Sequence, residues 1–123
     1  MAGLRMLIVE DEPDLRECLQ DFFTAKGFLV ACATGGDEAM DWLQQHVPDV
    51  LLLDVNMPGH SGIEVLRFAK QLYPEAKAVM VTGVERRETE ELARQYGAIG
   101  YIMKPFDFSD ATWGHILAKL QDP

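Results

Sequence analysis

The chain has 123 residues, which is enough for one domain with a hydrophobic core and too few for two. Apolar residues make up 48% and charged residues 25%, as in ordinary globular proteins rather than disordered, collagenous or membrane chains. The net charge of −9 argues against binding to nucleic acid, whose phosphates require clustered lysine and arginine, and it favours cations and basic partner surfaces.

Five apolar runs have the length of β-strands, and they are residues 4–9, 28–32, 50–53, 78–81 and 100–103. Several of them are apolar almost continuously, as expected for strands that are covered on both faces. The first run follows the amino terminus at once, so neither a signal peptide nor a membrane span fits there. We therefore expect a cytoplasmic protein.

Segments with the apolar spacing of helices alternate with these runs. Their apolar positions are Leu15, Cys18, Leu19, Phe22 and Phe23; Ala39, Leu43 and Val47; Ile63, Leu66, Ala69 and Tyr73; Leu92, Ala93 and Tyr96; and Trp113, Ile116, Leu117 and Leu120. Cys18 and Cys32 have neither metal-type nor disulfide-type spacing, and each falls on an apolar face of its predicted element. We expect both thiols to be buried.

Residues that begin or end helices agree with this division. Gly27 is suited to a helix end, and two pairs of residues have the spacing of a capping box. These pairs are Thr34 with Asp37, and Ser61 with Glu64. The pattern predicts helices that begin at these caps.

Five strands that alternate with five helices predict an α/β fold with a parallel sheet covered on both faces. For this size we expect a flavodoxin-like (βα)5 three-layer sandwich with strand order 2-1-3-4-5. Residues 1–123 would then form one domain.

Polar residues follow the predicted strands where each one ends. Glu10, Asp11 and Glu12 follow the first strand, Asp54 the third, Thr82 the fourth and Lys104 the fifth. Ligands of open α/β sheets bind beyond the carboxyl ends of the strands, where the strand order reverses. Because the first and third strands flank that point, we expect Glu10, Asp11 and Asp54 to converge there.

Three carboxylates in one place repel each other unless a positive charge compensates. Oxygen ligands with open positions suit Mg²⁺, which keeps water ligands and binds phosphate oxygens. Lys104 adds a mobile positive charge and Thr82 a hydroxyl donor. These parts can stabilise a phosphoryl group in transfer, with Asp54 as the nucleophile because it lies centrally.

Four segments resemble the response regulator receiver family of two-component signalling, and the likeness covers nearly the whole chain. They are Ile8-Val9-Glu10-Asp11-Glu12, Leu52-Leu53-Asp54-Val55-Asn56-Met57-Pro58-Gly59, Val81-Thr82-Gly83 and Lys104-Pro105-Phe106. The resemblance implies that Asp54 is the phosphoacceptor and Asp11 a direct Mg²⁺ ligand. It also implies that Glu10 binds the metal through water and that Asn56 contributes its backbone carbonyl.

The resemblance further implies how the domain would switch. Thr82 resembles the family's switch hydroxyl and Lys104 its phosphate-pairing lysine, with a cis peptide bond before Pro105. Tyr101 matches the family's aromatic switch, which turns inward once the threonine has moved to the phosphoryl group. The surface of the fourth helix, fifth strand and fifth helix would then change for downstream signalling.

Some positions depart from the family pattern. Gly83 stands where alanine is common and suggests a looser loop and a more mobile fourth helix. Gly100 stands where many transcription-factor receivers have an aspartate, which puts dimerisation through that face in doubt. Val84 cannot hydrogen-bond an attacking water, whereas the Asn56 side chain could. We therefore predict slow to intermediate autodephosphorylation.

The implied partners are a histidine kinase or a histidine phosphotransfer protein, and an output domain or target protein downstream. The domain would be a signalling switch that catalyses its own modification rather than a metabolic enzyme.

Two alternatives stay open: a receiver-like module regulated by partner contact without phosphorylation, and an enzyme on the same scaffold such as an aspartyl-phosphate phosphatase or a flavin or nucleotide binder. The intact set of Asp11, Asp54, Thr82 and Lys104 weighs against the first. Against the second, Asn56 stands where such phosphatases have a second acid, and no glycine-rich nucleotide loop follows the first strand.

Overall fold

The structure is a computed structural model that describes residues 3–84 and 86–122. The outermost ends of the predicted domain lie outside this part. Within it, five strands alternate with five helices, and no helix there is long and apolar enough to cross a membrane. The elements are β1 (Arg5–Val9), α1 (Pro13–Ala25), β2 (Leu29–Ala33), α2 (Gly36–Gln45), β3 (Val50–Leu53), α3 (Gly62–Leu72), β4 (Lys77–Thr82), α4 (Arg87–Gln95), β5 (Ala98–Met103) and α5 (Asp110–Gln121).

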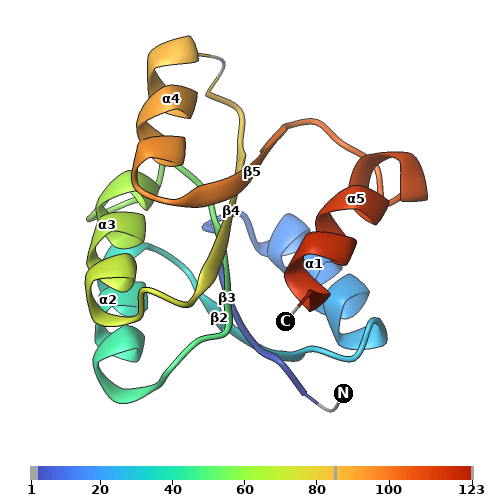
Figure 1. Cartoon of the computed structure of the whole chain (residues 1–123), viewed down its shortest axis with the longest axis horizontal. Helices are drawn as coiled ribbons and strands as arrows, with labels where there is room; N and C mark the ends of the chain where they lie inside the picture. The colour runs from blue at the N-terminus through green and yellow to red at the C-terminus, as the bar shows by residue number, and fades with distance from the viewer. Residues whose placement is uncertain (1–2, 85, 123) are drawn as a thin grey trace.

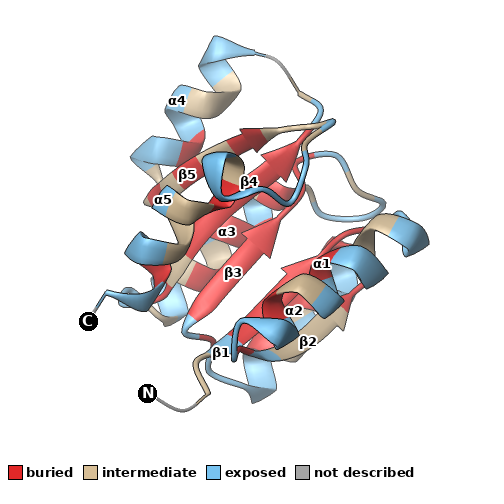
Figure 2. Ribbon diagram, turned by 90° about the vertical axis from the view of Figure 1, so that its right-hand side faces the viewer, coloured by how far each residue is buried: buried red, intermediate tan, exposed pale blue. Residues whose placement is uncertain are grey.

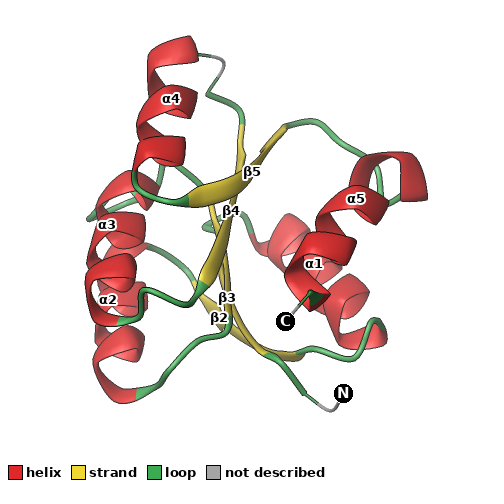
Figure 3. Cartoon of the chain, in the orientation of Figure 1, coloured by secondary structure: helices red, strands yellow, loops and turns green. Residues whose placement is uncertain are grey.

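All neighbouring strands are parallel, and the sheet has the order β2-β1-β3-β4-β5. Helices α2, α3 and α4 cover one face and α1 and α5 cover the other (Figure 1, Figure 3). The predicted three-layer sandwich and its strand order are confirmed. Because β1 and β3 are neighbours, their carboxyl ends meet, with Val9 paired to Leu53.

The sheet forms the centre of the core, as the buried strands of Figure 2 show. All four residues of β3 are buried. Leu51 and Leu53 pack toward α2, α3 and α4, whereas Val50 and Leu52 pack toward α1 and α5. Burial on both faces explains why this run is apolar without alternation.

The helix ends agree only in part with the predicted caps. Gly27 follows α1 with a φ of 97°, a conformation that favours glycine. Ser61 and Glu64 form a complete capping box at α3. The box expected at Thr34 and Asp37 is wrong, because the first helical residue is Gly36 and the preceding residue has no side-chain cap.

Tertiary packing decides where α2 begins. The backbone N–H of Gly36 donates to the carbonyl of Pro58 over 3.3 Å. A Cβ atom on Gly36 would lie 1.9 Å from the carbonyl oxygen of His60, so only glycine permits this approach. The start of α2 is therefore set by contact with the loop that follows β3.

Three residues that the sequence places on apolar faces are less buried than expected. Cys18 is exposed and Cys32 is only partly buried. The buried stripe of α1 is formed by Leu19 and Phe23, and Cys18 lies outside it. Val47 is 59% exposed, because α2 ends at Gln45 and a residue before proline is disfavoured in a helical conformation.

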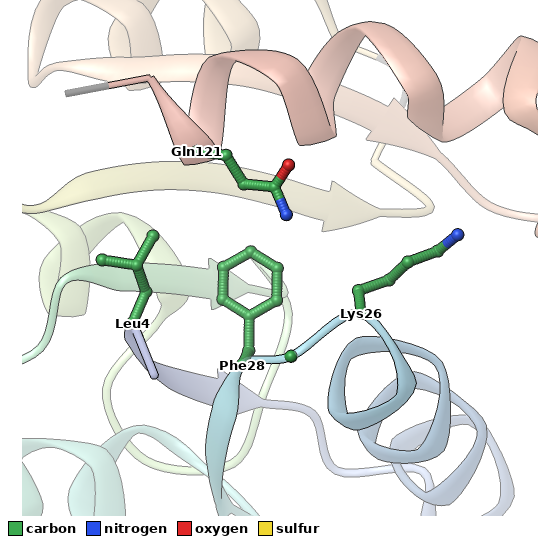
Figure 4. Close-up of a pocket in the computed structure, with 5 residues that line it drawn as sticks. Leu4, Lys26, Phe28 and Gln121 are labelled. Atoms are coloured by element: carbon green, nitrogen blue, oxygen red, sulfur yellow. The ribbon is translucent and has the colours of Figure 1, made fainter. Parts of the chain in front are cut away.

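A hollow of about 360 Å³ lies at the amino-terminal end of β1 and is lined by Leu4, Lys26, Gly27, Phe28 and Gln121 (Figure 4). It is at the opposite end of β1 from Glu10, where the predicted site begins. The polar residues that follow the strands therefore do not contribute to it.

Candidate functional site

The carboxyl ends of the central strands bring one lysine and two buried acids together. Glu10 and Asp54 follow directly after β1 and β3, and only 1% and 5% of their surfaces are exposed. Lys104, which follows β5, places its Nζ 2.7 Å from Asp54 Oδ2 and 2.9 Å from Glu10 Oε1. Residues that are 94 and 50 positions apart thus form one ion-pair network.

A third acid completes a cluster of oxygen donors. One carboxylate oxygen from each of Glu10, Asp11 and Asp54 lies within 4.8 Å of the others. Asp11 is exposed, so the cluster is open to solvent on that side. Hard oxygen donors with an open side fit a divalent cation that keeps water ligands, as Mg²⁺ does. The donor set therefore fits the predicted metal.

The charges of this network depend on burial and pairing. Burial raises the pKa of Glu10 above its ordinary value, and the hydrogen bond from Lys104 offsets part of that rise. Burial alone would lower the pKa of Lys104, but its hydrogen bonds to Asp54 and Glu10 outweigh burial and raise it. Lys104 therefore remains an ammonium at neutral pH.

The loop after β3 carries Asn56 beside the central acid. The backbone N–H of Asn56 donates to Asp54 Oδ1 over 3.3 Å. Gly62, the first residue of α3, lies so close that a Cβ atom there would be 1.8 Å from the carbonyl oxygen of Asp54. The loop therefore packs tightly around the strand end that carries Asp54.

Thr82 and Tyr101 both contact the backbone of Val84. Thr82 is fully buried, and its Oγ1 accepts a hydrogen bond from the N–H of Val84 over 3.2 Å. The hydroxyl of Tyr101 donates to the carbonyl of Val84 over 2.8 Å. Burial and the charges of Glu90 and Asp54 raise the pKa of Tyr101, so its hydroxyl stays a neutral donor.

The peptide bond between Lys104 and Pro105 is cis, as the resemblance implies. The backbone N–H of Lys104 donates to the carbonyl of Thr82 over 2.9 Å. This bond continues the β4–β5 pairing past Met103, so Lys104 leaves the sheet next to Thr82.

Sequence reasoning missed two groups of contacts around the site. Arg16 of α1 donates to the carbonyl of Glu10 over 3.0 Å. His60 and Asp37 are joined by a 2.6 Å contact that ties the loop after β3 to α2. The first contact joins a side chain to a backbone carbonyl and the second joins two side chains that are 23 positions apart, and neither leaves a periodic or motif signal in the sequence.

The fold and this strand edge define a class of protein: a parallel three-layer α/β domain with a cluster of three acids and a paired lysine where the strand order reverses. The sequence model of the response regulator receiver domain matches residues 6–112. The chain belongs to that family and is a receiver domain of two-component signalling.

Curated relatives agree with this assignment. The chain is 36% identical over 104 residues to the "Probable C4-dicarboxylate response regulator DctR" of Bacillus subtilis, which covers 83% of this chain and 46% of that protein. It is 34% identical over 106 residues to the regulatory protein AtoC of Escherichia coli, covering 86% of this chain and 23% of that protein. The chain therefore matches less than half the length of these two relatives.

Solved structures share the fold. A receiver domain protein of Methanospirillum hungatei, described as CheY-like, has a TM-score of 0.89 at 29% identity and covers 97% of this chain and 94% of its own. The response regulator TrrA of Thermotoga maritima, solved in complex with Mg²⁺ and BeF, has a TM-score of 0.81 at 30% identity. The match covers 98% of this chain and 99% of the TrrA chain.

Proposed function

We propose that this chain accepts a phosphoryl group on Asp54 and acts as a signalling switch. One observation carries the proposal: the Lys104 ammonium lies 2.7 Å from a buried Asp54 carboxylate within a cluster of three acids. An acid at the centre of such a cluster can carry an acyl phosphate if the charges around it are neutralised. Residues 1–123 would act as one domain in the cytoplasm.

Four residues would hold the divalent cation. Asp11 and Asp54 would bind it directly, Glu10 through water, and Asn56 through its backbone carbonyl. When bound, Mg²⁺ supplies positive charge to the oxygens of the transferring phosphoryl group. The opening of the acid cluster on the side of exposed Asp11 supports this assignment.

The chain's own residues would perform the transfer. A carboxylate oxygen of Asp54 forms the new bond to phosphorus while the bond from phosphorus to a histidine nitrogen of the donor breaks. That donor is a histidine kinase or a histidine phosphotransfer protein. Lys104 would pair with one phosphoryl oxygen, and the Thr82 hydroxyl would donate to another, because both groups lie at the ends of strands beside Asp54.

The switch would run through the backbone of Val84. If the Thr82 hydroxyl turns to the phosphoryl group, it no longer accepts the hydrogen bond from the N–H of Val84. The carbonyl of the same residue accepts the hydrogen bond from the Tyr101 hydroxyl. The arrangement of the loop before α4 would then change, and with it the surface of α4, β5 and α5. An output domain or a target protein would read that surface.

We further propose that the chain catalyses only its own phosphorylation and a slow to intermediate hydrolysis. Val84 has no side-chain group that could orient an attacking water, while the exposed Asn56 amide could do so. A phosphoaspartate half-life of only seconds in purified protein with Mg²⁺ would contradict this rate.

The experiment compares Asp54→Asn with Asp41→Asn, an exposed acid of α2. Each protein is treated with a small acyl phosphate donor and Mg²⁺ and followed by phosphate-affinity electrophoresis. The native chain and Asp41→Asn should become phosphorylated, Asp54→Asn should not, and a chelator should abolish the reaction. Equal phosphorylation of Asp54→Asn would refute the proposal. Failure of the native chain to bind beryllofluoride would favour regulation by partner contact alone.

A further inference from the structure

The carbonyl groups of the acidic loop after β1 have an unusual partner. β1 ends at Val9, so the carbonyl of the next residue, Glu10, lies beyond the sheet ladder, although the residue is only 1% exposed. Nη1 of Arg16 donates to this carbonyl over 3.0 Å and to the carbonyl of Asp11 over 3.5 Å. On the other side, the N–H of Glu10 donates to the carbonyl of Ala33 over 3.1 Å. The loop is therefore held from two directions.

The position of Arg16 in α1 makes this contact possible. Its backbone N–H donates to the carbonyl of Glu12 over 2.9 Å, so it stands in the first turn of the helix. Side chains of a helix lean toward its amino terminus, which directs the Arg16 side chain back over the loop. A guanidinium carries several N–H donors in a planar fork and can serve two neighbouring carbonyls.

Asp11 has little else to orient it. Among the described residues, its carboxylate takes part in no hydrogen bond or ion pair, and the residue is exposed. The direction in which its side chain leaves the loop must therefore come from the backbone. Among the described residues, the contacts that tie the backbone of residues 10 and 11 to other elements are those that Arg16 makes from α1 and that the N–H of Glu10 makes with β2. Within the loop, the N–H of Glu12 donates to Glu10 Oε2.

We propose that Arg16 is a positioning residue for the divalent cation site. By holding the carbonyls of Glu10 and Asp11, it fixes the direction of both carboxylates toward Asp54. This inference rests on the proposed function, since it concerns the same metal site. Arg16 contacts carbonyl oxygens rather than carboxylates, so it orders the acids without competing with the cation for their oxygens.

The test is a calorimetric titration of Mg²⁺ into the metal-free chain and its variants. Loss of a residue that orients metal ligands typically weakens metal binding tenfold or more, so Arg16→Ala should raise the dissociation constant about tenfold. Arg16→Lys should recover part of this loss, because an ammonium can still donate to one carbonyl. Gln20→Ala, at an exposed position one turn further along α1, should bind like the native chain.

A purely structural role for Arg16 predicts a different pattern. In that case Arg16→Ala would unfold at a lower urea concentration in chelator yet bind Mg²⁺ within about twofold of the native chain, and this result would overturn the inference. A lysine variant as weak as the alanine variant would also contradict it. If Arg16→Ala does not fold, Arg16→Lys decides: it should bind more weakly than the native chain, and equal binding rejects the inference.

The native chain serves as the test of the underlying function. If the native chain binds no Mg²⁺, the proposed function fails. If it binds Mg²⁺ and only the comparison of variants fails, the proposed function stands and the role of Arg16 is rejected. Hydrogen exchange of the amides of residues 10–12, measured without metal, should be faster in Arg16→Ala and unchanged in Gln20→Ala.

Discussion

Glu10 carries a carboxyl group at a buried position, where its charged form destabilises the folded state. Its carboxylate is almost fully buried, and it accepts hydrogen bonds from Lys104 and from the N–H of Glu12. Burial is nonetheless the larger effect on its pKa. Burial therefore disfavours the carboxylate form of Glu10, which is the form that binds a metal. A bound cation would stabilise that form.

The raised pKa of Glu10 predicts that the folding stability of the metal-free chain depends on pH. Because the pKa of Glu10 is raised from 4.5, the folded state binds the proton more tightly than the unfolded chain does. The stabilising effect of that proton is complete below about pH 4.5 and is lost as the pH rises through the folded pKa. In chelator, Glu10→Gln should gain stability relative to the native chain as the pH rises from 4.5 to neutral.

Urea denaturation at several pH values measures this gain. Glu17→Gln, which replaces an exposed acid of α1, is the matched control and should follow the native chain. If the free energy of unfolding changes with pH in the same way for Glu10→Gln and the native chain, burial of this carboxylate does not affect folding.

At the scale of the elements, helix ends hold the loops that carry the site. α3 begins at Gly62 directly beneath Asp54, and Ser61 caps it by accepting the N–H of Glu64 over 3.2 Å. The carboxylate of Glu64 in turn accepts a hydrogen bond from the N–H of Ser61 over 3.0 Å. The cap thereby fixes the point where the loop after β3 turns into the helix.

Two substitutions separate a real cap from one that only has the right spacing. Ser61→Ala removes the acceptor of the capping box and should destabilise folding by about 1 kcal/mol. Thr34→Ala alters the other pair with capping-box spacing, but its side chain caps no helix, so stability should change by less than about 0.5 kcal/mol. Thermal or urea unfolding measures both values. Equal losses would contradict the assignment of the caps.

At the scale of the whole molecule, the sheet separates two hydrophobic layers. Leu43 of α2 belongs to the layer beneath α2, α3 and α4, and Leu19 of α1 belongs to the layer beneath α1 and α5. Both side chains are almost fully buried. In the part of the chain that the structure describes, the strands lie between the two layers (Figure 1).

This separation predicts additive effects of mutations on opposite faces. Leu43→Ala and Leu19→Ala should each cost about 2–5 kcal/mol, as large-to-small core substitutions do. Their double variant should match the sum within about 0.5 kcal/mol. Leu43→Ala with Leu66→Ala, which lie in one layer, is the comparison pair in which additivity should fail. The measurement is the free energy of unfolding in urea, and a large coupling across the sheet would contradict the two-layer description.

Particular residues show how far sequence reasoning reached. Asp54 and Lys104 could be assigned to one edge because each directly follows an apolar run of strand length, and parallel strands end on the same side. Cys18 and Val47 were misplaced because apolar character alone does not fix the buried stripe or the last turn of a helix. Arg16 could not be found at all, because its partners are backbone carbonyls.

The sequence by itself determined the strands, the helices, their order and the polar residues that end the strands, since these depend on the period of apolar residues and on turn chemistry between near neighbours. Only the tertiary structure decided that Lys104 reaches both Glu10 and Asp54, that α2 begins at Gly36, and that Arg16 and Tyr101 hold the loops. These contacts depend on packing between distant segments, where distances of a few tenths of an ångström decide which groups meet.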